Sequence, residues 1–320
     1  MRIFNIEEIS ALDAKTVVTV GMFDGVHAGH RHLLSSLAQT ARERLQSPIV
    51  VTFDRHPRLV MNSDARLRLL STYDERMRML EECGVTDVAI VHFTVQTASL
   101  SACQFVQQFL LPKLGMKTLL LGYDNMFGSH SSNDFDLLPQ LAKEYGFDIC
   151  RDNAMWIDGV AVSSTKIRQA LSLGNIDVAN AMLGSPYTLS GTVVHGRHVG
   201  TTLGFPTANI MPDDSHKMLP APGVYALRAT VGGRVYKAIA NLGSQPTFHN
   251  DRQVLEAHLL DFDGDIYGRE IEVEFIERLR DIREFANAEE LRFQIEQDKQ
   301  SAIHAVFELS RDEKTTVSKK

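Results

Sequence analysis

The chain has 320 residues, 44% of them hydrophobic and 23% charged, which is the composition of a folded protein and argues against a disordered or fibrous one. Its formal net charge of −7 argues against nucleic-acid binding through bulk positive charge. It does not exclude a small anionic ligand, which local basic side chains and backbone N–H groups can bind. The three cysteines, Cys83, Cys103 and Cys150, are too scattered for a disulfide framework or a zinc site. With neither a signal peptide nor a membrane-spanning apolar stretch visible, we expect a cytoplasmic protein without membrane or nucleic-acid partners.

The first half alternates short apolar runs with helical patterns. Strands are predicted at residues 16–21, 49–53, 88–93 and 118–122, and helices at residues 30–45, 73–83, 102–114 and 137–145. In the first helix, Leu33, Leu37, Ala41 and Leu45 recur every four residues and form one apolar face. Apolar strands separated by amphipathic helices predict a doubly wound, Rossmann-like α/β domain with a parallel sheet. Such a sheet binds its ligand at the carboxyl ends of the strands.

The second half has a different pattern. Two short helices are predicted, at residues 166–173 and up to Gly184, and residues 184–186 (GSP) read as a linker. Strands follow at residues 187–195, 223–231, 234–240, 254–261 and 270–278, and a terminal helix at residues 288–309. Successive strands without intervening helices predict an antiparallel sheet or small barrel. We therefore expect domains at residues 1–184 and 185–310, followed by a disordered tail at 311–320.

Residues 20–30, VGMFDGVHAGH, run from the first predicted strand into the first helix. The glycines permit close backbone approach, and the helix start offers free N–H groups and a positive dipole end to a phosphate. His27 and His30 can both point at that phosphate and donate hydrogen bonds to charge that develops on it. Two exposed histidines at a helix start are the alternative interpretation.

This segment resembles the H-x-G-H motif of the HIGH-type nucleotidyltransferases, and the longer pattern resembles the FAD synthetase module of bifunctional riboflavin kinase/FAD synthetases. Residues 162–168, VSSTKIR, resemble the S-S-T-x-I-R motif of the same module. The resemblance implies that His27, His30 and Arg168 are catalytic. It also implies ATP contacts from Gly21, Phe23, Asp24, Gly25, Gly29, Asp124, Ser164 and Thr165. Ser164 and Thr165 would serve equally well as helix N-caps.

Two further segments resemble the flavin side of that module. Residues 52–57, TFDRHP, match its T-F-x-x-H-P pattern, which implies flavin contacts from Phe53, His56 and Pro57. A core position at the strand end is the alternative for Phe53. Residues 122–128, GYDNMFG, resemble G-x-[DN]-F-R-F-G, except that Asn125 and Met126 replace the inner Phe and Arg.

Residues 200–209, GTTLGFPTAN, resemble the G-x-x-L-G-F-P-T-A-N signature of riboflavin kinases, which implies a small antiparallel β-barrel with a terminal helix. Thr207 and Asn209 alternate and would share one face of an extended segment. Their oxygens are hard ligands that suit Mg²⁺ with ATP phosphates, although the segment could also be only a turn. The resemblance implies ATP contacts from Gly200, Gly204, Pro206, Thr207 and Asn209.

Glu256 lies in residues 254–262, VLEAHLLDF, which match the riboflavin kinases' E-x-H-x-x-D-F context. Phosphoryl transfer needs a residue that orients or deprotonates the attacking hydroxyl, and the resemblance assigns this role to Glu256. A solvent-facing glutamate on a half-exposed strand is the alternative.

Together these motifs imply Mg²⁺-dependent conversion of riboflavin and ATP to FMN, and of FMN and ATP to FAD. Basic residues that the family commonly has are replaced by Met126, Thr201 and Gln245. Candidates to compensate for them are Arg197, His198 and Lys217. Two rivals therefore stay open: a degenerate flavin- or nucleotide-binding sensor or carrier, and an enzyme with only one of the two activities.

Overall fold

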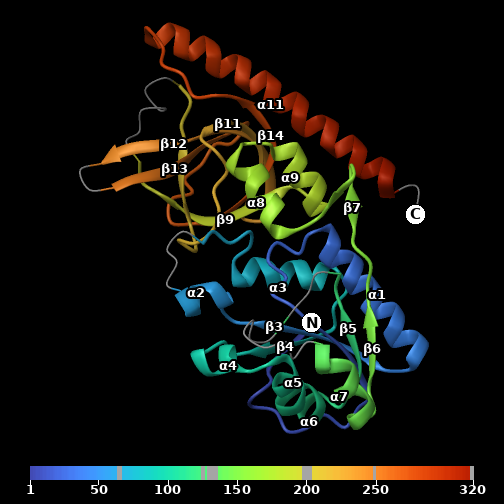
Figure 1. The fold of residues 1–320 in the computed structure, drawn as a ribbon. Coiled ribbons are helices and arrows are strands. Elements are labelled where there is room, and N and C mark those ends of the chain that lie inside the picture. The colour runs from blue at the N-terminus through green and yellow to red at the C-terminus, as the bar shows by residue number, and fades with distance from the viewer. Residues whose placement is uncertain (63–66, 124–126, 128–135, 197–203, 248–249, 318–320) are drawn as a thin grey trace. The chain divides into compact units, whose positions relative to one another are not determined.

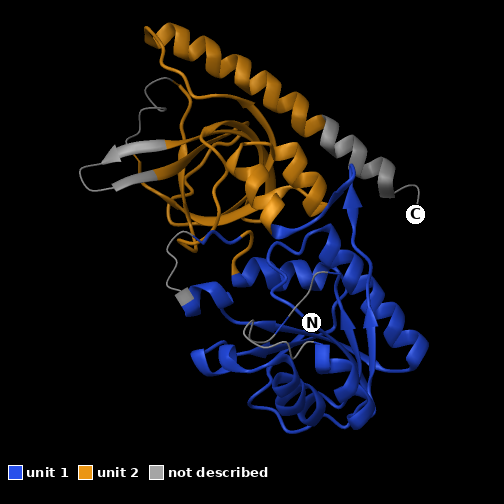
Figure 2. Cartoon of the chain, viewed as in Figure 1, with its two compact units in different colours: residues 1–69, 73–164 blue, residues 70–72, 165–320 orange. Residues whose placement is uncertain are grey.

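The computed structural model describes residues 1–62, 67–123, 127, 136–196, 204–247 and 250–317, which form two compact units (Figures 1 and 2). The first unit contains residues 1–69 and 73–164, and the second contains residues 70–72 and 165–320. The division falls before the predicted boundary at residue 184 because helix α9 (Ile176–Leu183) packs on the barrel. The Asn180 side chain of α9, for example, donates a hydrogen bond of 2.8 Å to the carbonyl of Phe275.

The first unit is built on a six-stranded parallel sheet, which confirms the predicted fold. The strands lie in the order β1 (Arg2–Asn5), β4 (Asp87–Val91), β3 (Ser47–Phe53), β2 (Thr16–Val20), β5 (Met116–Leu121) and β6 (Asp148–Arg151). The four inner strands are those predicted from the sequence. The edge strands β1 and β6 are short and have no fully buried residue, so they lack the apolar run that identifies the others.

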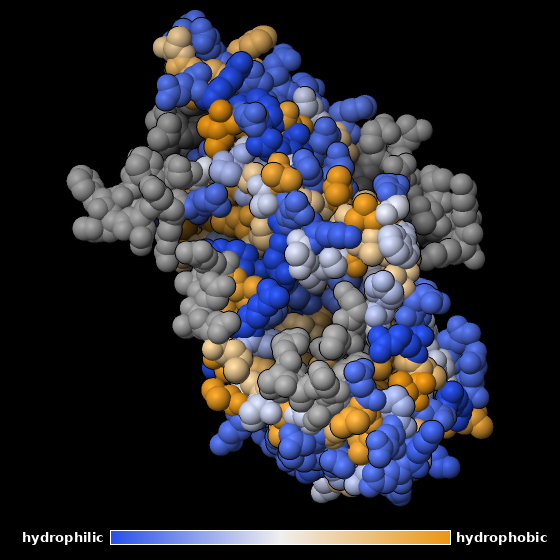
Figure 3. Space-filling view, in the orientation of Figure 1, coloured by the Kyte–Doolittle hydropathy of each residue, from blue (hydrophilic) through white to orange (hydrophobic). Residues whose placement is uncertain are grey.

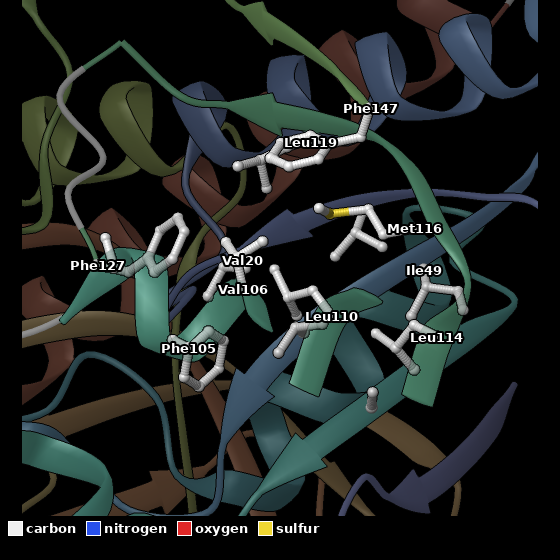
Figure 4. Packing of buried hydrophobic residues seen from close by; sticks show 14 of the residues in the cluster. Val20, Ile49, Phe105, Val106, Leu110, Leu114, Met116, Leu119, Phe127 and Phe147 are labelled. Atoms are coloured by element: carbon white, nitrogen blue, oxygen red, sulfur yellow. The ribbon is translucent and has the colours of Figure 1, made fainter. Parts of the chain in front are cut away.

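Alternating residues of the inner strands divide the core of this unit into two layers. Val18 and Leu119 belong to a cluster with α5 (Ala102–Phe105), α6 (Leu111–Leu114) and α7 (Leu138–Tyr145), part of which is drawn in Figure 4. Their neighbours Val17 and Leu120 belong to a second cluster, with α1 (Ala28–Arg44) and α3 (Tyr73–Glu82). Because successive strand residues point to opposite faces, this division is the signature of a sheet covered on both sides.

The helix predicted over residues 102–114 contains a π-helical segment, Val106–Leu110, between α5 and α6. Pro112 follows at the start of α6. Proline has no N–H and its ring crowds the carbonyl four residues earlier, so regular α-helical bonding cannot run through this point. The shorter elements of the unit are α2 (Pro57–Asn62), α4 (Val95–Ser99) and the hairpin of β7 (Trp156–Ile157) and β8 (Val160–Ala161).

The second unit is a closed antiparallel barrel, as predicted. Its order is β10 (Ala208–Pro212), β13 (Asn250–Leu259), β12 (Arg234–Thr247), β11 (Gly223–Val231), β14 (Glu270–Arg280) and β9 (Tyr187–Val194). Strand β10, which is part of the G-F-P-T-A-N segment, was not predicted. It joins the two ends of the sheet by pairing with both β9 and β13. The helix α8 (Ser164–Ser172) precedes α9.

The terminal helix α11 (Ala288–Val317) lies along the outside of the barrel (Figure 1). Ala302, Ala305 and Val306 pack against Ala226 and Ile276, and the small alanine side chains permit close approach. The buried carboxylate of Asp298 also accepts hydrogen bonds from Arg280, of 3.0 and 3.1 Å from Nε and of 2.7 Å from Nη2. Where the sequence predicts a disordered tail from residue 311, helical backbone continues to Val317.

On the face drawn in Figure 3, the coloured hydrophobic residues lie in small groups among hydrophilic ones. No helix in the described part of the chain is long and apolar enough to cross a membrane.

Candidate active sites

The loop after β2 holds an unusual backbone at the carboxyl edge of the parallel sheet. Gly25 has a φ of 80°, and two non-glycine residues, Phe23 and Val26, have φ values of 52° and 37°. Each such residue costs on the order of 1–3 kcal/mol and persists only where surrounding packing holds it. Both side chains are buried in the cluster with α1 and α3, which supplies that packing. The loop is therefore held in one conformation directly before the two histidines.

His27 and His30 lie together at the N-terminus of α1, as the H-x-G-H spacing predicts. His27 is the N-cap, and its Nδ1 accepts a hydrogen bond of 3.3 Å from the backbone N–H of His30. The two rings stack with their centroids 3.6 Å apart and an interplanar angle of 13°. Gly29 permits this arrangement, because a Cβ there would lie 3.3 Å from the His27 ring.

His30 is set up as a neutral hydrogen-bond donor. Burial lowers its pKa well below the ordinary value, and the neighbouring His27 ring lowers it further. Its buried Nδ1 has no hydrogen-bond partner among the described residues. This imidazole lies beside a helix N-terminus and has a buried nitrogen that no described residue bonds, so it is suited to donate a hydrogen bond to a phosphate oxygen.

We expect acid pH to lower the free energy of unfolding through His30. Because its folded pKa lies below the unfolded value of about 6.5, the unfolded chain binds more protons as the pH falls below that value. Stability should therefore decrease from about pH 6.5 downward, until the folded pKa is passed. Urea unfolding between pH 7.5 and 5 should show a weaker pH dependence in His30→Asn than in the wild type. An unchanged dependence would rule out this imidazole as its source.

The other residues predicted to contact ATP are divided between the two units, and one of them lies outside the described residues. Asp24 is buried in the loop, and its backbone carbonyl accepts a hydrogen bond of 3.1 Å from the hydroxyl of Ser164. Thr165 and Arg168 lie on α8 and belong to the second unit, so their predicted contacts stay predictions. Asp124 lies outside the described residues.

On the predicted flavin side, Phe53 is packed into the core. Its ring meets the ring of Phe93 edge-on at a centroid distance of 5.2 Å and that of Phe105 at 6.4 Å. This position fits the core alternative. His56 and Pro57 are half-buried at the start of α2, where His56 Nδ1 accepts a hydrogen bond of 3.2 Å from the N–H of Arg58.

The structure adds Arg76 to this edge of the sheet. Its guanidinium donates hydrogen bonds to the carbonyls of Met22 and Phe53. Met22 lies in the segment that carries the H-x-G-H motif, and Phe53 lies in the T-F-x-x-H-P segment. The available sequence signal was its position on α3 four residues before the buried Leu80, which places a cation on the apolar face of the helix.

In the barrel, three polar residues form one row across neighbouring strands. Asn209 of β10 is paired with Glu256 of β13, which is paired on its other side with Asn241 of β12. Residues directly opposite each other in antiparallel strands point to the same face. Their chain neighbours Ala208, Ala257 and Ala240 are buried in the barrel, so this row faces outward. Asn241 was not predicted, because its partners are distant in sequence.

Two pockets meet at Thr207. One, of ≈ 330 Å³, is lined by Glu256 and Asn241 on the barrel wall and by residues of α11, including Leu291 and Ile295. The other, of ≈ 260 Å³, lies beside Phe262 and Tyr267. Thr207 lines both. Ligands in the two pockets could therefore both contact Thr207, and Glu256 lines one of the two pockets.

The turn before Thr207 is held by the strand that carries Glu256. The ring of His258, two residues further along β13, donates from Nδ1 to the carbonyl of Pro206 at 2.7 Å. Gly204 has a φ of 86°, a conformation that favours glycine. Gly200 lies outside the described residues, as do Met126, Thr201, Arg197, His198 and the side chain of Gln245. Lys217 is buried, and its Nζ donates to the carbonyl of Leu70 at 2.7 Å.

The side chain of Asn209 lies directly over the Cα of Gly196. A Cβ at Gly196 would be 2.0 Å from Nδ2 and 2.8 Å from Oδ1 of Asn209, distances that no real contact allows. Asn209 is 6% exposed, so it has little room to move aside. Oxygen ligands from Thr207 and Asn209, with the carboxylate of Glu256 in the same row, have the chemistry that Mg²⁺ requires.

Comparison with known proteins agrees with this division into two sites. The FAD synthetase family model matches residues 9–166, and the riboflavin kinase family model matches residues 183–306. The bifunctional riboflavin kinase/FMN adenylyltransferase of Escherichia coli K12 is 40% identical over 89% of this chain and 91% of its own length. The protein of the same description from Bacillus subtilis is 35% identical over 91% of this chain and 92% of its own.

A solved structure described as a macrolide-efflux protein from Streptococcus pneumoniae has the same fold. It is 31% identical, covers 94% of this chain and 98% of its own, and has a TM-score of 0.84. Both family models and the curated relatives agree on one assignment: the chain belongs to the family of bifunctional riboflavin kinase/FMN adenylyltransferases and contains both of its domains.

Proposed function

We propose that this chain makes FMN from riboflavin at the barrel site and FAD from FMN at the parallel-sheet site, with Mg·ATP as the donor in both steps. The observation that carries the kinase half is the meeting of two pockets at Thr207, one of them lined by Glu256. The predicted domains, residues 1–184 for the adenylyltransferase and 185–310 for the kinase, are part of this proposal. We also propose a cytoplasmic location, because Cys83, Cys103 and Cys150 form no disulfide with one another, as is usual in a reducing compartment.

In the kinase step, the pocket between the barrel wall and α11 receives riboflavin, and the pocket beside Phe262 and Tyr267 receives ATP. Apolar and aromatic residues such as Ile239 and Phe285 line the first pocket and suit a flavin ring. Glu256 accepts the proton of the ribityl 5′-hydroxyl as its oxygen attacks the γ-phosphorus, and ADP leaves. Thr207 and Asn209 would hold Mg²⁺, which neutralises phosphate charge when bound.

In the adenylyltransferase step, ATP lies with its α-phosphate at the N-terminus of α1. The phosphate of FMN attacks the α-phosphorus, and pyrophosphate leaves. His27 and His30 donate hydrogen bonds to the oxygens on which charge builds up, and the backbone N–H groups of α1 add to this stabilisation. Ser164, Thr165 and Arg168 bind the β- and γ-phosphates, as the resemblance to the S-S-T-x-I-R motif implies.

The deciding experiment is incubation of the purified chain with riboflavin and Mg·ATP, with FMN and FAD separated by chromatography. Formation of FMN followed by FAD is expected. Formation of FMN without FAD would leave only the kinase proposal, and FAD formed only from added FMN would leave only the adenylyltransferase. If neither product forms but flavin still binds, the chain is a sensor or carrier.

We expect Gly196→Ala to lower FMN formation on the order of 10²-fold, because the added methyl must displace the Asn209 carboxamide. FAD formation from added FMN should not change. The double variant Gly196→Ala/Asn209→Ala should be no slower than Asn209→Ala alone, since the displaced group is already absent. Additive losses in the double variant would show that Gly196 acts independently of Asn209.

A further inference from the structure

We propose that Arg76 is a positioning residue for adenylyl transfer, holding the H-x-G-H loop and the T-F-x-x-H-P loop in their relative positions. This inference rests on the proposed adenylyltransferase function of the first unit. Arg76 belongs to α3, is 2% exposed, and therefore does not itself reach a ligand in solvent. It acts through the backbone that it holds.

The guanidinium of Arg76 joins the ends of two neighbouring parallel strands. Nη1 donates to the carbonyl of Met22 at 2.9 Å, and Nη2 donates to the carbonyl of Phe53 at 2.6 Å. Met22 lies two residues beyond β2, and Phe53 is the last residue of β3. A planar group with donors in a fixed fork sets the distance between two carbonyls in a way that a single ammonium cannot.

Both carbonyls belong to backbone that leads directly into the candidate adenylyltransferase site, so a small displacement of either carbonyl would also displace residues of that site. Met22 directly precedes Phe23, the first residue of the positive-φ loop that leads to His27. Phe53 directly precedes Asp54, whose carboxylate accepts a hydrogen bond of 2.8 Å from the N–H of Phe93, just beyond β4. Arg76 and Asp54 together thus tie the carboxyl ends of β2, β3 and β4, the edge at which such sheets bind their ligands.

Stability alone does not favour a cation at this position. A buried charge is costly, and an apolar residue of similar size would satisfy the same face of α3. Burial lowers the pKa of Arg76 to about 10, against the attraction of Asp24, so the group stays charged at neutral pH. Its Nε has no hydrogen-bond partner among the described residues. The charge is retained at the edge of the sheet where a polyphosphate is expected, which favours a functional role.

The test compares Arg76→Met and Arg76→Lys with Arg78→Met, an exposed arginine two residues along the same helix. Arg76→Met should lower kcat for FAD formation about 10²-fold, with much smaller changes in KM for FMN and ATP, because geometry is lost and the ligand contacts remain. Arg76→Lys should recover part of kcat, since it keeps the charge and one bond. FMN formation by the same molecules serves as the internal control and should stay unchanged, and Arg78→Met should retain both activities.

A second readout follows the histidines directly. The imidazole NMR signals of His27 and His30 should shift in Arg76→Met and keep their wild-type positions in Arg78→Met. Full FAD-forming kcat in Arg76→Met would overturn the inference, as would equal loss of both activities in Arg76→Met and Arg76→Lys, which would mark a general folding role. A wild type that makes no FAD would instead defeat the proposed adenylyltransferase function, and the positioning role with it.

Discussion

Glu256→Gln is expected to stop FMN formation while the same protein still converts added FMN to FAD. The amide keeps the size of the side chain and its place in the row with Asn209 and Asn241, but it cannot accept the proton of the attacking hydroxyl. General-base catalysis contributes on the order of 10²–10⁴-fold, so FMN formation should fall by that factor. Initial rates of FMN formation from riboflavin and of FAD formation from FMN give the two values.

The matched control is Glu277→Gln, an exposed glutamate on β14 that lines neither barrel pocket. It should leave both rates at the wild-type level. If Glu256→Gln phosphorylated riboflavin at the wild-type rate, Glu256 would be only a solvent-facing strand residue, and another group would have to receive the proton.

His30→Ala is expected to have the opposite selectivity, with FAD formation lowered on the order of 10²–10³-fold and FMN formation unchanged. The neutral imidazole of His30 is held by the ring of His27 and by burial, so it can donate to a phosphate without reorganising first. Removing one such preorganised donor raises the barrier for the charged transition state more than it weakens ground-state binding.

His32→Ala provides the control for this change. His32 is on the same helix but exposed, with its Nε2 3.4 Å from Asp152. It should retain both activities, and His30→Asn, which keeps a donor, should retain part of the FAD-forming rate. Equal rates in His30→Ala and His32→Ala would remove His30 from the proposed mechanism.

The predicted elements that matched best were those with strong local patterns. The inner strands of the parallel sheet were found because each contains a run of mostly apolar residues, and β11 was found at its observed bounds, Gly223–Val231. Strands β1, β6 and β10 were not found because each is short and owes its strand conformation to hydrogen bonds with partners distant in the chain. The π-helical segment likewise interrupts a helix whose apolar pattern continues through it.

The candidate sites divide in the same way. Motif residues such as His27, His30, Thr207 and Glu256 could be named because each lies in a short segment whose spacing carries its chemistry. Arg76 and Asn241 could not, because their partners are 54 and 15 residues away, and the only local signal was the place of Arg76 on the apolar face of α3. Phe53 shows that a motif match does not determine where a side chain lies. Its motif implies a flavin contact, and its ring lies in the core among Phe93 and Phe105.

The amino-acid order alone was sufficient for the family, for both reactions and for the two kinds of fold, because these depend on short-range periodicity and contiguous motifs. Only the tertiary structure revealed that two pockets meet at Thr207, that Gly196 leaves space for Asn209, and that Arg76 joins two motif loops. Each of these is a contact between segments brought together by chain reversal, strand register or helix packing. Such contacts arise from the closing of the sheet and the barrel, so they have no signature in any one stretch of residues.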